Sequence, residues 1–545
     1  MSVPDQDLLG ESTGVKDGFK HSPLPSTKSE LTTEQAPESA LTPDKASQQY
    51  PHGIRLFLVV SALLLSMFLI ALDMSVDNIG WYASAFFITL AVFQSAWGKA
   101  YQYFDLKLTF LLTIFLFEVG SLICGVAQNS ITLIIGRAIA GLGGAGVTGG
   151  VYTIMAFTVP PPKVPKYLGL IGAVFSVASV AGPLLGGVFA GEATWRWCFY
   201  LNLPVGGVAM AILILFFQTP EAVKPIPVTV KELLVVMDIP GIVLCMGSLI
   251  CLSLAMQWGG TSKPWSSPDV IGTLVGFAIM LVSFVVDQWY FGEKAMLVLR
   301  VFRHRTVLAV SIFIFFLNSA NFLLIYNLPE YFQIVQGASA IDSGLQNLSL
   351  ILSTALTTLI SGYALGKVRI YPAFLITSAG FLTLGAGLIY TLDSGSSLGK
   401  IIGFQILVGV GVGMGIQVPV AAAQDAFVAG GSPADVPVAT AVVLFFQLIA
   451  GAVFVAASQA LLTTRMVATL ATLAPGLAPS TVLGVGATEI RSVFSGSDLS
   501  NVVQAYMAGI KDSWAMSIGL AGVTFLIAFT GKWGKMHEAP AVSVA

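Results

Sequence analysis

The chain has 545 residues, of which 55% are hydrophobic and only 10% are charged. Water-soluble globular proteins carry roughly 25% charged residues, so this composition, with a mean hydropathy of +0.84, excludes a soluble protein. A net charge of -2 at pH 7 gives no basic surface for nucleic acid. The four cysteines lie in or beside apolar segments, where we expect small apolar side chains and no disulfide framework.

The first 54 residues form a polar stretch that is rich in Ser, Thr, Pro, Glu and Lys and has no apolar periodicity. Such a composition buries too little apolar surface to fold, so we expect residues 1–54 to be a disordered cytoplasmic tail. We expect no cleavable signal peptide, because the first apolar run begins only at Leu56. Residues 532–545 are expected to form a second, short cytoplasmic tail.

Between the tails, apolar stretches of about 20 residues alternate with short polar segments. This pattern predicts an all-α polytopic membrane protein with 14 transmembrane helices. The expected spans are 56–72, 80–97, 108–127, 130–150, 167–190, 199–217, 239–257, 270–287, 306–327, 343–364, 371–391, 400–422, 436–461 and 513–531.

The distribution of Lys and Arg predicts the orientation, because these residues are retained on the cytoplasmic side. With the N-terminus inside, the inward segments hold 19 of them and the outward segments hold 6. The even number of spans then puts both tails in the cytoplasm. The longest interhelical segment, 463–512, is expected outside, either capping the outer face or as a mobile loop without a role in transport.

The sequence does not contain the residues that several classes of function require. The histidines form no H-x-x-H pair and lie in the tails or in one loop, so neither a metal site nor an enzyme is expected: His21, His52, His304 and His537. The phosphate-binding motif G-x-x-x-x-G-K-[ST] is absent from the sequence, and the glycine cluster in 141–150 indicates close helix packing instead. A secondary transporter, a channel or a transporter-like sensor remains.

The fifth span contains a candidate hinge made of Gly182, Pro183, Gly186 and Gly187. Proline removes a backbone hydrogen bond, and glycines permit bending and tight contact. A bendable helix between two bundles suits alternating access. The alternative is that Gly and Pro are simply common in transmembrane helices.

This stretch resembles the antiporter motif of the major facilitator superfamily. Residues 194–207 (TWRWCFYLNLPVGG) are similar to the W-R-W-x-F-x-x-N-x-P-x-G signature of its fourteen-helix drug:proton antiporter branch. Residues 80–87 and 97–101 resemble the fungal members that export toxins and other secondary metabolites.

The resemblance implies a major facilitator fold of 6+2+6 helices. The six-helix bundles would be 55–217 and 306–531, the latter including the outer segment 463–512, and the linker 218–305 would carry two extra helices and a basic cytoplasmic loop. It implies proton-coupled export of small amphipathic organic molecules by a monomer, without a cofactor. We expect the plasma membrane, with a vacuolar or vesicle membrane as the alternative.

The resemblance also implies residues for proton coupling. Arg137 matches the arginine of the motif R-x-x-Q-G, although Ala140 replaces its glutamine, and Asp73 matches the aspartate of L-D-x-T. An intramembrane charge is costly unless it is paired, so these two are natural partners. Glu118 in the third span is expected to face the bundle interior, with either a proton or substrate role or a buried hydrogen-bonded role.

Two features depart from the family. The loop after the second helix usually reads G-x-L-x-D-x-x-G-R-K, but here Gln102 replaces the aspartate and Leu106 the arginine, so we do not expect the gating salt-bridge network of that loop. Only 17 apolar residues, 56–72, precede Asp73, and the usual further helix before Gly80 is absent, as after a short internal deletion. We therefore expect Asp73 at the water interface, weakly bound to Arg137, and poor transport.

Amide and aromatic side chains within the spans could line a substrate cavity, although each could equally connect helices or fill space between them. The candidates are Trp81, Phe86, Asn318, Asn321, Tyr326, Gln417, Phe446 and Gln447. Two functions remain as alternatives: an importer or uniporter of the same superfamily, such as a siderophore carrier, and a nontransporting sensor, which would need a folded signalling region.

Overall fold

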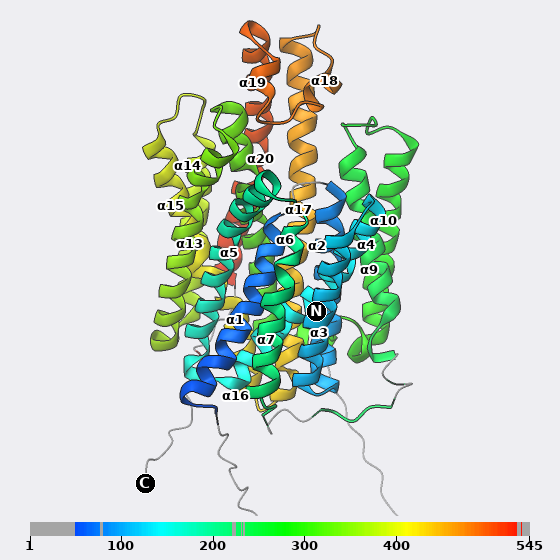
Figure 1. Cartoon of the computed structure of the whole chain (residues 1–545), viewed down its shortest axis with the longest axis vertical. Helices are drawn as coiled ribbons and strands as arrows, with labels where there is room; N and C mark the ends of the chain where they lie inside the picture. Colours follow the sequence, from blue (N-terminus) through cyan, green and yellow to red (C-terminus); the bar gives the residue numbers. More distant parts are fainter. Residues whose placement is uncertain are drawn as a thin grey trace, which may run out of the picture. The chain divides into compact units, whose positions relative to one another are not determined.

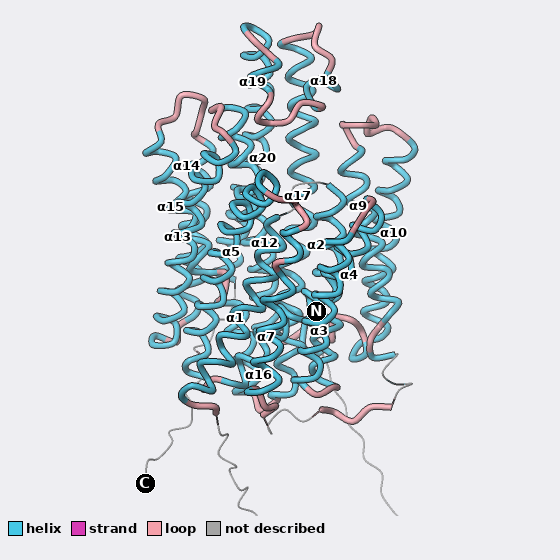
Figure 2. Tube along the Cα trace, viewed as in Figure 1, coloured by secondary structure: helices cyan, strands magenta, loops and turns pink. Residues whose placement is uncertain are grey.

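A computed structural model describes residues 50–76, 80–220, 225–229, 232, 235–530 and 536. The chain divides into a unit of residues 1–47 and a unit of residues 48–545, and only the second contains described residues. Within them the secondary structure is helical, and the tube in Figure 2 shows helices and loops but no strand. Most of the predicted tail, 1–49, and most of 532–545 lie outside the described residues.

The N-terminal bundle contains the first six predicted spans, the sixth formed by two consecutive helices (Figure 1). Helices α2 and α3 pack on α4, whereas α5 and α7 pack on α1. The helices are α1 (Gly53–Val76), α2 (Gly80–Tyr103), α3 (Leu106–Val126), α4 (Ser130–Thr158), α5 (Val164–Glu192), α6 (Trp197–Tyr200) and α7 (Asn202–Phe216), with the short η1 (Pro161–Lys163) before α5.

Glycines bring α4 into close contact with its neighbours. A Cβ atom added to Gly143 would lie 2.3 Å from the backbone nitrogen of Phe117, and one added to Gly141 would lie 2.1 Å from Thr89 Oγ1. Any side chain at these positions would push the helices apart. The interpretation of the cluster in 141–150 as a packing surface is confirmed.

The linker forms an antiparallel pair of helices, α9 (Ile239–Trp258) and α10 (Pro268–Phe291). Helix α9 also contacts α2 and α17, whereas α10 presents most of its apolar side chains outward, as a lipid-facing helix does. The short η2 (Gly292–Lys294) and α11 (Leu299–Phe302) lead from this pair into the C-terminal bundle.

The C-terminal bundle is organised around α12, α17 and α20, which contact one another, and α13, α14 and α15 complete it. Its elements are α12 (Arg305–Glu330), η3 (Tyr331–Val335), α13 (Ala340–Val368), α14 (Tyr371–Tyr390), α15 (Leu398–Gly415), α16 (Val418–Ala429), η4 (Pro433–Asp435), α17 (Val436–Leu473), α18 (Pro479–Leu483), α19 (Ile490–Val493) and α20 (Gly496–Thr530). The two bundles meet where α2 packs on α17 and α5 packs on α13.

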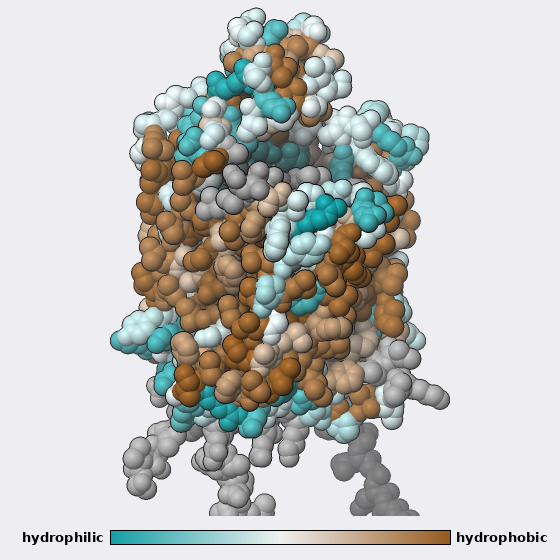
Figure 3. Space-filling view, in the orientation of Figure 1, coloured by the Kyte–Doolittle hydropathy of each residue, from teal (hydrophilic) through white to brown (hydrophobic). Residues whose placement is uncertain are grey.

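The predicted all-α membrane fold is confirmed. Thirteen helices among the described residues are long and apolar enough to cross a membrane. The remaining predicted span, 80–97, coincides with α2, which has 24 residues and is less apolar because it packs between protein helices. The face seen in Figure 3 is mostly hydrophobic along the helices and more polar at both ends, as a bilayer requires.

Two predicted boundaries are wrong. Helix α1 begins at Gly53, inside the predicted tail, and continues to Val76; its Arg55 is accommodated because Nε donates to the carbonyl of Phe216 at 2.9 Å. The segment 463–512 is not one interhelical loop, since α17 extends through it to Leu473 and α20 begins already at Gly496. Helix α17 has 38 residues, about 57 Å at 1.5 Å per residue, which exceeds a hydrocarbon core of about 30 Å.

We call the end of the helices that holds the start of α1 the inner end, because the sequence predicts that it faces the cytoplasm, and the opposite end the outer end. The inner end is the lower end in Figure 1. Helices α18 and α19, labelled at the upper end, join the extensions of α17 and α20. A role for these extensions as a cap stays a prediction.

Candidate functional site

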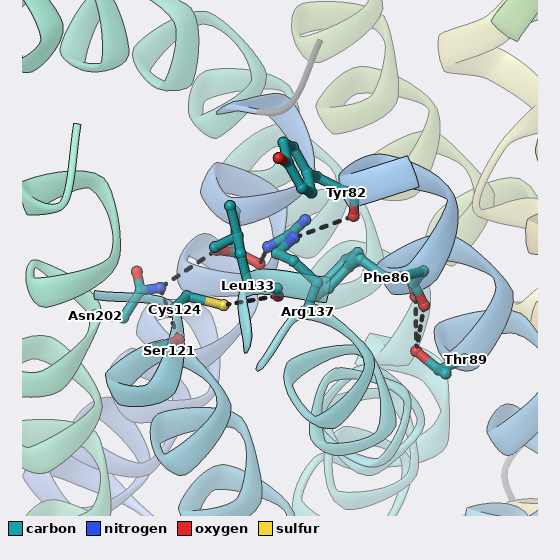
Figure 4. A network of polar contacts seen from close by, with 10 residues as sticks. Tyr82, Phe86, Thr89, Ser121, Cys124, Leu133, Arg137 and Asn202 are labelled. Carbon is teal, nitrogen blue, oxygen red and sulfur yellow. Dashed lines mark hydrogen bonds and ion pairs between the residues drawn. The ribbon is translucent and has the colours of Figure 1, made fainter. Parts of the chain in front are cut away.

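A buried ion pair connects α1 with α4. The Arg137 guanidinium donates from Nη1 to Asp73 Oδ2, and each side chain is only 1% exposed. The guanidinium also lies over the Phe86 ring, 4.2 Å from its centroid, and Nε donates to the carbonyl of Tyr82 at 3.4 Å. The site therefore holds Arg137 by a carboxylate, a carbonyl and an aromatic face together (Figure 4).

Helix α7 completes the surroundings of the carboxylate. Asn202 Nδ2 donates to Asp73 Oδ1 at 3.5 Å and to Ser121 Oγ of α3 at 3.1 Å. Asn202 and Ser121 are fully buried. Five helices, α1, α2, α3, α4 and α7, thus contribute to one polar network in an apolar bundle (Figure 4).

Glu118 lies one turn before Ser121 on α3 and faces α7, as predicted for a residue turned to the bundle interior. Both of its carboxyl oxygens are buried and have no hydrogen-bond partner among the described residues. Gly206 makes room for it, since a Cβ atom there would lie 1.7 Å from Glu118 Oε1. The hydrogen-bonded alternative for Glu118 therefore has no support among the described contacts.

The expectation that Asp73 lies at the water interface, weakly bound to Arg137, is wrong. Asp73 is 2% exposed and paired. The error arose because α1 begins earlier and continues past Asp73, so its 24 residues are sufficient for a span. The predicted junction follows Met74, where the structure describes a continuous helix to Val76 but not the side chains from Met74 onward. The deletion and the poor transport stay predictions, and sequencing the transcript across this junction tests the first.

The candidate hinge lies in α5, which continues as a helix through Pro183. Gly182 is buried, and α5 packs on both α1 and α13. The side chains and surroundings of Pro183, Gly186 and Gly187 lie outside the described residues. Hinge motion stays a prediction.

Several of the predicted cavity residues make packing contacts. Phe86 belongs to the arginine site, and Asn318 Nδ2 donates to the backbone carbonyl of Gln447 at 2.7 Å. Phe446 stacks on Phe302, with ring centroids 5.4 Å apart. Asn318 and Phe446 therefore help to connect or fill the C-terminal part of the protein.

Three other cavity candidates lie in different surroundings. Gln417 is 7% exposed and faces α5, where a Cβ atom on Gly172 would lie 2.8 Å from its Nε2. Asn321 has a buried Oδ1 without a partner among the described residues, and Tyr326 lies beside Phe322. The Trp81 side chain lies outside the described residues.

A cavity of about 1050 Å³ lies at the outer end of the C-terminal bundle, where Arg491, Asp342 and Gln346 belong to its lining. No predicted cavity residue lines it. Among the described residues, no cluster of three or more His, Cys, Asp or Glu side chains could hold a metal ion. The substrate path through the bundles stays a prediction.

Sequence reasoning missed three residues of the site: Ser121, Asn202 and Gly206. A signal for two of them was present, because Asn202 and Gly206 are the asparagine and the glycine of the W-R-W-x-F-x-x-N-x-P-x-G stretch. Ser121 carries no such signal, since serine is an ordinary residue of membrane helices.

The helical fold and its buried, paired charges define a polytopic membrane protein of the transporter class. The sequence model of the Major Facilitator Superfamily matches residues 53–455. The chain belongs to the major facilitator superfamily.

Fungal relatives are similar over nearly their whole length. The MFS-type transporter grgE of Penicillium sp is 41% identical over 92% of this chain and 91% of that protein. The probable efflux pump gsfJ of Penicillium aethiopicum is 42% identical over 90% of each chain. The dehydrocurvularin exporter of Aspergillus terreus is 37% identical over 91% of this chain and 89% of that protein.

Solved structures share the fold at low identity. The human organic anion transporter MFSD10 (TETRAN) has a TM-score of 0.54 and 13% identity, covering 87% of this chain and 99% of that chain. The proton:xylose symporter XylE, bound to 6-bromo-6-deoxy-D-glucose, has a TM-score of 0.55 and 12% identity, covering 88% and 96%. At these identities the likeness concerns the fold alone.

Proposed function

We propose that the chain is a proton-coupled efflux transporter for small amphipathic organic molecules, such as drugs, toxins or secondary metabolites. The direction of transport is supported by relatives of 37–42% identity whose names include a probable efflux pump and a dehydrocurvularin exporter. We further propose that it acts as a monomer in the plasma membrane, because one chain contains both bundles and export from the cell requires that membrane.

The observation that carries the coupling to protons is the contrast between two carboxyl groups of one bundle. Asp73 is held by Arg137 and Asn202, whereas Glu118 has no hydrogen-bond partner among the described residues. A buried carboxylate without a partner is very costly, and a protonated carboxyl group is much less so. Asp73 therefore carries the negative charge in this state, and Glu118 carries the exchangeable proton.

The polar network connects the protonation state of Glu118 with the contact between α1 and α4. Asn202 contacts both Asp73 and Ser121, and Ser121 lies on the same face of α3 as Glu118. Loss of the proton from Glu118 places a second negative charge near the Asp73–Arg137 pair. This charge competes for Arg137 and weakens the connection between α1 and α4, on which the change between outward and inward access depends.

Transport from energised cells tests the proposal, with rhodamine 6G and a hydroxylated macrolide as probe molecules. Cells that express the chain should lose either probe faster than cells that express Arg137→Ala, and a protonophore should abolish the difference. Efflux that survives the protonophore but stops on ATP depletion would contradict proton coupling. Faster accumulation of the probes would indicate an importer instead.

A further inference from the structure

The inner end contains a second charge cluster, centred on Asp435 directly before α17. The Asp435 side chain is 8% exposed. Arg300 of α11 donates from Nη1 and Nη2 to its two oxygens, at 2.8 Å and 3.0 Å. Such a bidentate pair is the strongest and most oriented form of an arginine–carboxylate contact. The hydrogen bonds to Asp435 raise the pKa of Arg300 above its ordinary value.

The same carboxylate also reaches the N-terminal bundle. Gln102, near the end of α2, donates from Nε2 to Asp435 Oδ1 at 3.1 Å. One turn earlier on α2, a Cβ atom on Gly98 would lie 2.3 Å from the Cβ atom of Ala441 in α17. Helices α2 and α17 therefore meet closely at the inner end, and Asp435 is in contact with both bundles and the linker.

The pair of extra helices holds Arg300 in place. Asp238, before α9, accepts hydrogen bonds from Gln288 Nε2 at 2.9 Å and from the backbone nitrogen of Met296. Gln288 Oε1 in turn accepts from the backbone nitrogen of Leu297 at 2.7 Å. The chain is thus fixed to the base of α9 and α10 only three residues before Arg300.

Helix α2 is tied to the same base. Lys99 is 1% exposed, and its Nζ donates to the carbonyls of Val236 at 2.6 Å and Lys294 at 2.9 Å. Val236 comes just before α9 and Lys294 just after α10, so both carbonyls lie at the inner end of this helix pair. The inner end of the α9–α10 pair is therefore connected to both bundles, to α2 through Lys99 and to the start of α17 through Arg300.

We propose that Arg300 is a positioning residue that keeps the inner end closed by pairing with Asp435, and that the α9–α10 pair fixes the position of Arg300. The inference rests on the proposed function, because opening of the inner end is a step of transport.

The test measures how fast a reagent reaches the interface of the bundles from the inner side. Thr358 of α13 is fully buried there, against Gly169 and Gly172 of α5. In a chain whose four cysteines are replaced by alanine, Thr358→Cys is alkylated with a charged, membrane-impermeant maleimide in inside-out vesicles. The rate increases with the fraction of molecules that are open at the inner end.

Arg300→Ala and Asp435→Asn should each raise the alkylation rate by roughly threefold or more, because each removes the bidentate contact between these two residues. Arg300→Ala also removes the contact of Arg300 Nε with Oε2 of the exposed Glu293, at 3.2 Å. The double variant should add nothing further, since both residues act as one unit. Arg300→Lys should lie between, as lysine retains the charge without the bidentate geometry. Arg303→Ala is the control, because the side chain of this nearby exposed arginine has no ion pair among the described residues.

Equal rates for the wild type, Arg300→Ala and Asp435→Asn would overturn the proposal, and so would rates that multiply in the double variant. If Arg300→Ala fails to insert, the comparison of Asp435→Asn with the wild type decides. Alkylation needs neither a substrate nor a proton gradient. A chain that proves not to export therefore still gives this result, and the two proposals fail separately.

Discussion

Arg137 in α4 donates a hydrogen bond to the carboxylate of Asp73 in α1, and each of these charged side chains is 1% exposed. Neither charge could be buried in an apolar bundle without the other. The two residues are 64 positions apart in sequence. The pair therefore connects α1 with α4, and a change in charge near the pair acts on both helices.

Arg137→Ala should abolish transport while the chain still inserts into the membrane. Removing one partner of a buried pair costs about 3–5 kcal/mol, because the other charge stays buried alone. We therefore expect a lower Tm together with the loss of efflux. The double variant Asp73→Leu with Arg137→Leu should regain the Tm but not the transport, because it restores an apolar core without a coupling charge. Efflux at the wild-type rate by Arg137→Ala would show that transport does not require the pair.

Glu118→Gln should uncouple transport from the proton gradient. The amide has nearly the shape of the protonated carboxyl group but cannot release a proton. Exchange of a labelled probe across proteoliposomes without a gradient should therefore persist, while uphill transport driven by a pH step should be lost. Glu489→Gln, which changes an exposed carboxylate at the outer end, is the control. Normal uphill transport by Glu118→Gln would exclude Glu118 as the proton carrier.

The sequence allowed prediction of the fold and of the ion pair for a physical reason. A bilayer requires long apolar spans and makes an unpaired charge within a span costly, so both features can be recognised in the sequence. Asp73 and Arg137 could be recognised as partners because each needs an opposite charge. Glu118 could be recognised as buried, but the sequence does not show that Gly206 of α7 lies against its carboxyl group or that this group has no hydrogen-bond partner among the described residues.

The inner cluster and the outer extensions could not be predicted. Arg300 lies in an ordinary basic loop, and its pairing with Asp435, 135 positions away, depends on how α9 and α10 hold the linker. The ends of α17 and α20 extend outside the expected spans, because helices that pack on each other in water need fewer apolar residues. Leu462 shows such packing, since its carbonyl would lie 2.4 Å from a Cβ atom on Gly509.

Gly186→Leu should impair transport more than Pro183→Ala. A leucine side chain forces neighbouring helices apart, whereas loss of the proline can straighten α5 and still preserve its contacts. Membrane yield and efflux of the two variants are compared with those of the wild type. Near-normal activity in both would make this part of α5 an ordinary glycine-rich helix.

Gly206→Ala should impair transport, whereas Gly207→Ala should not. A Cβ atom at Gly206 would lie 1.7 Å from Glu118 Oε1, but one at Gly207 would meet no atom within 4 Å. The Glu118 carboxyl group is the flexible end of a side chain, so it can move away, and we expect a cost of about 1–3 kcal/mol from overpacking with the bundle still folded. Its displacement changes the distance to the Asp73–Arg137 pair, so uphill transport should fall more than the Tm does. The two variants share one helix and one added methyl group, so equal efflux by both would show that transport does not depend on the position of Glu118.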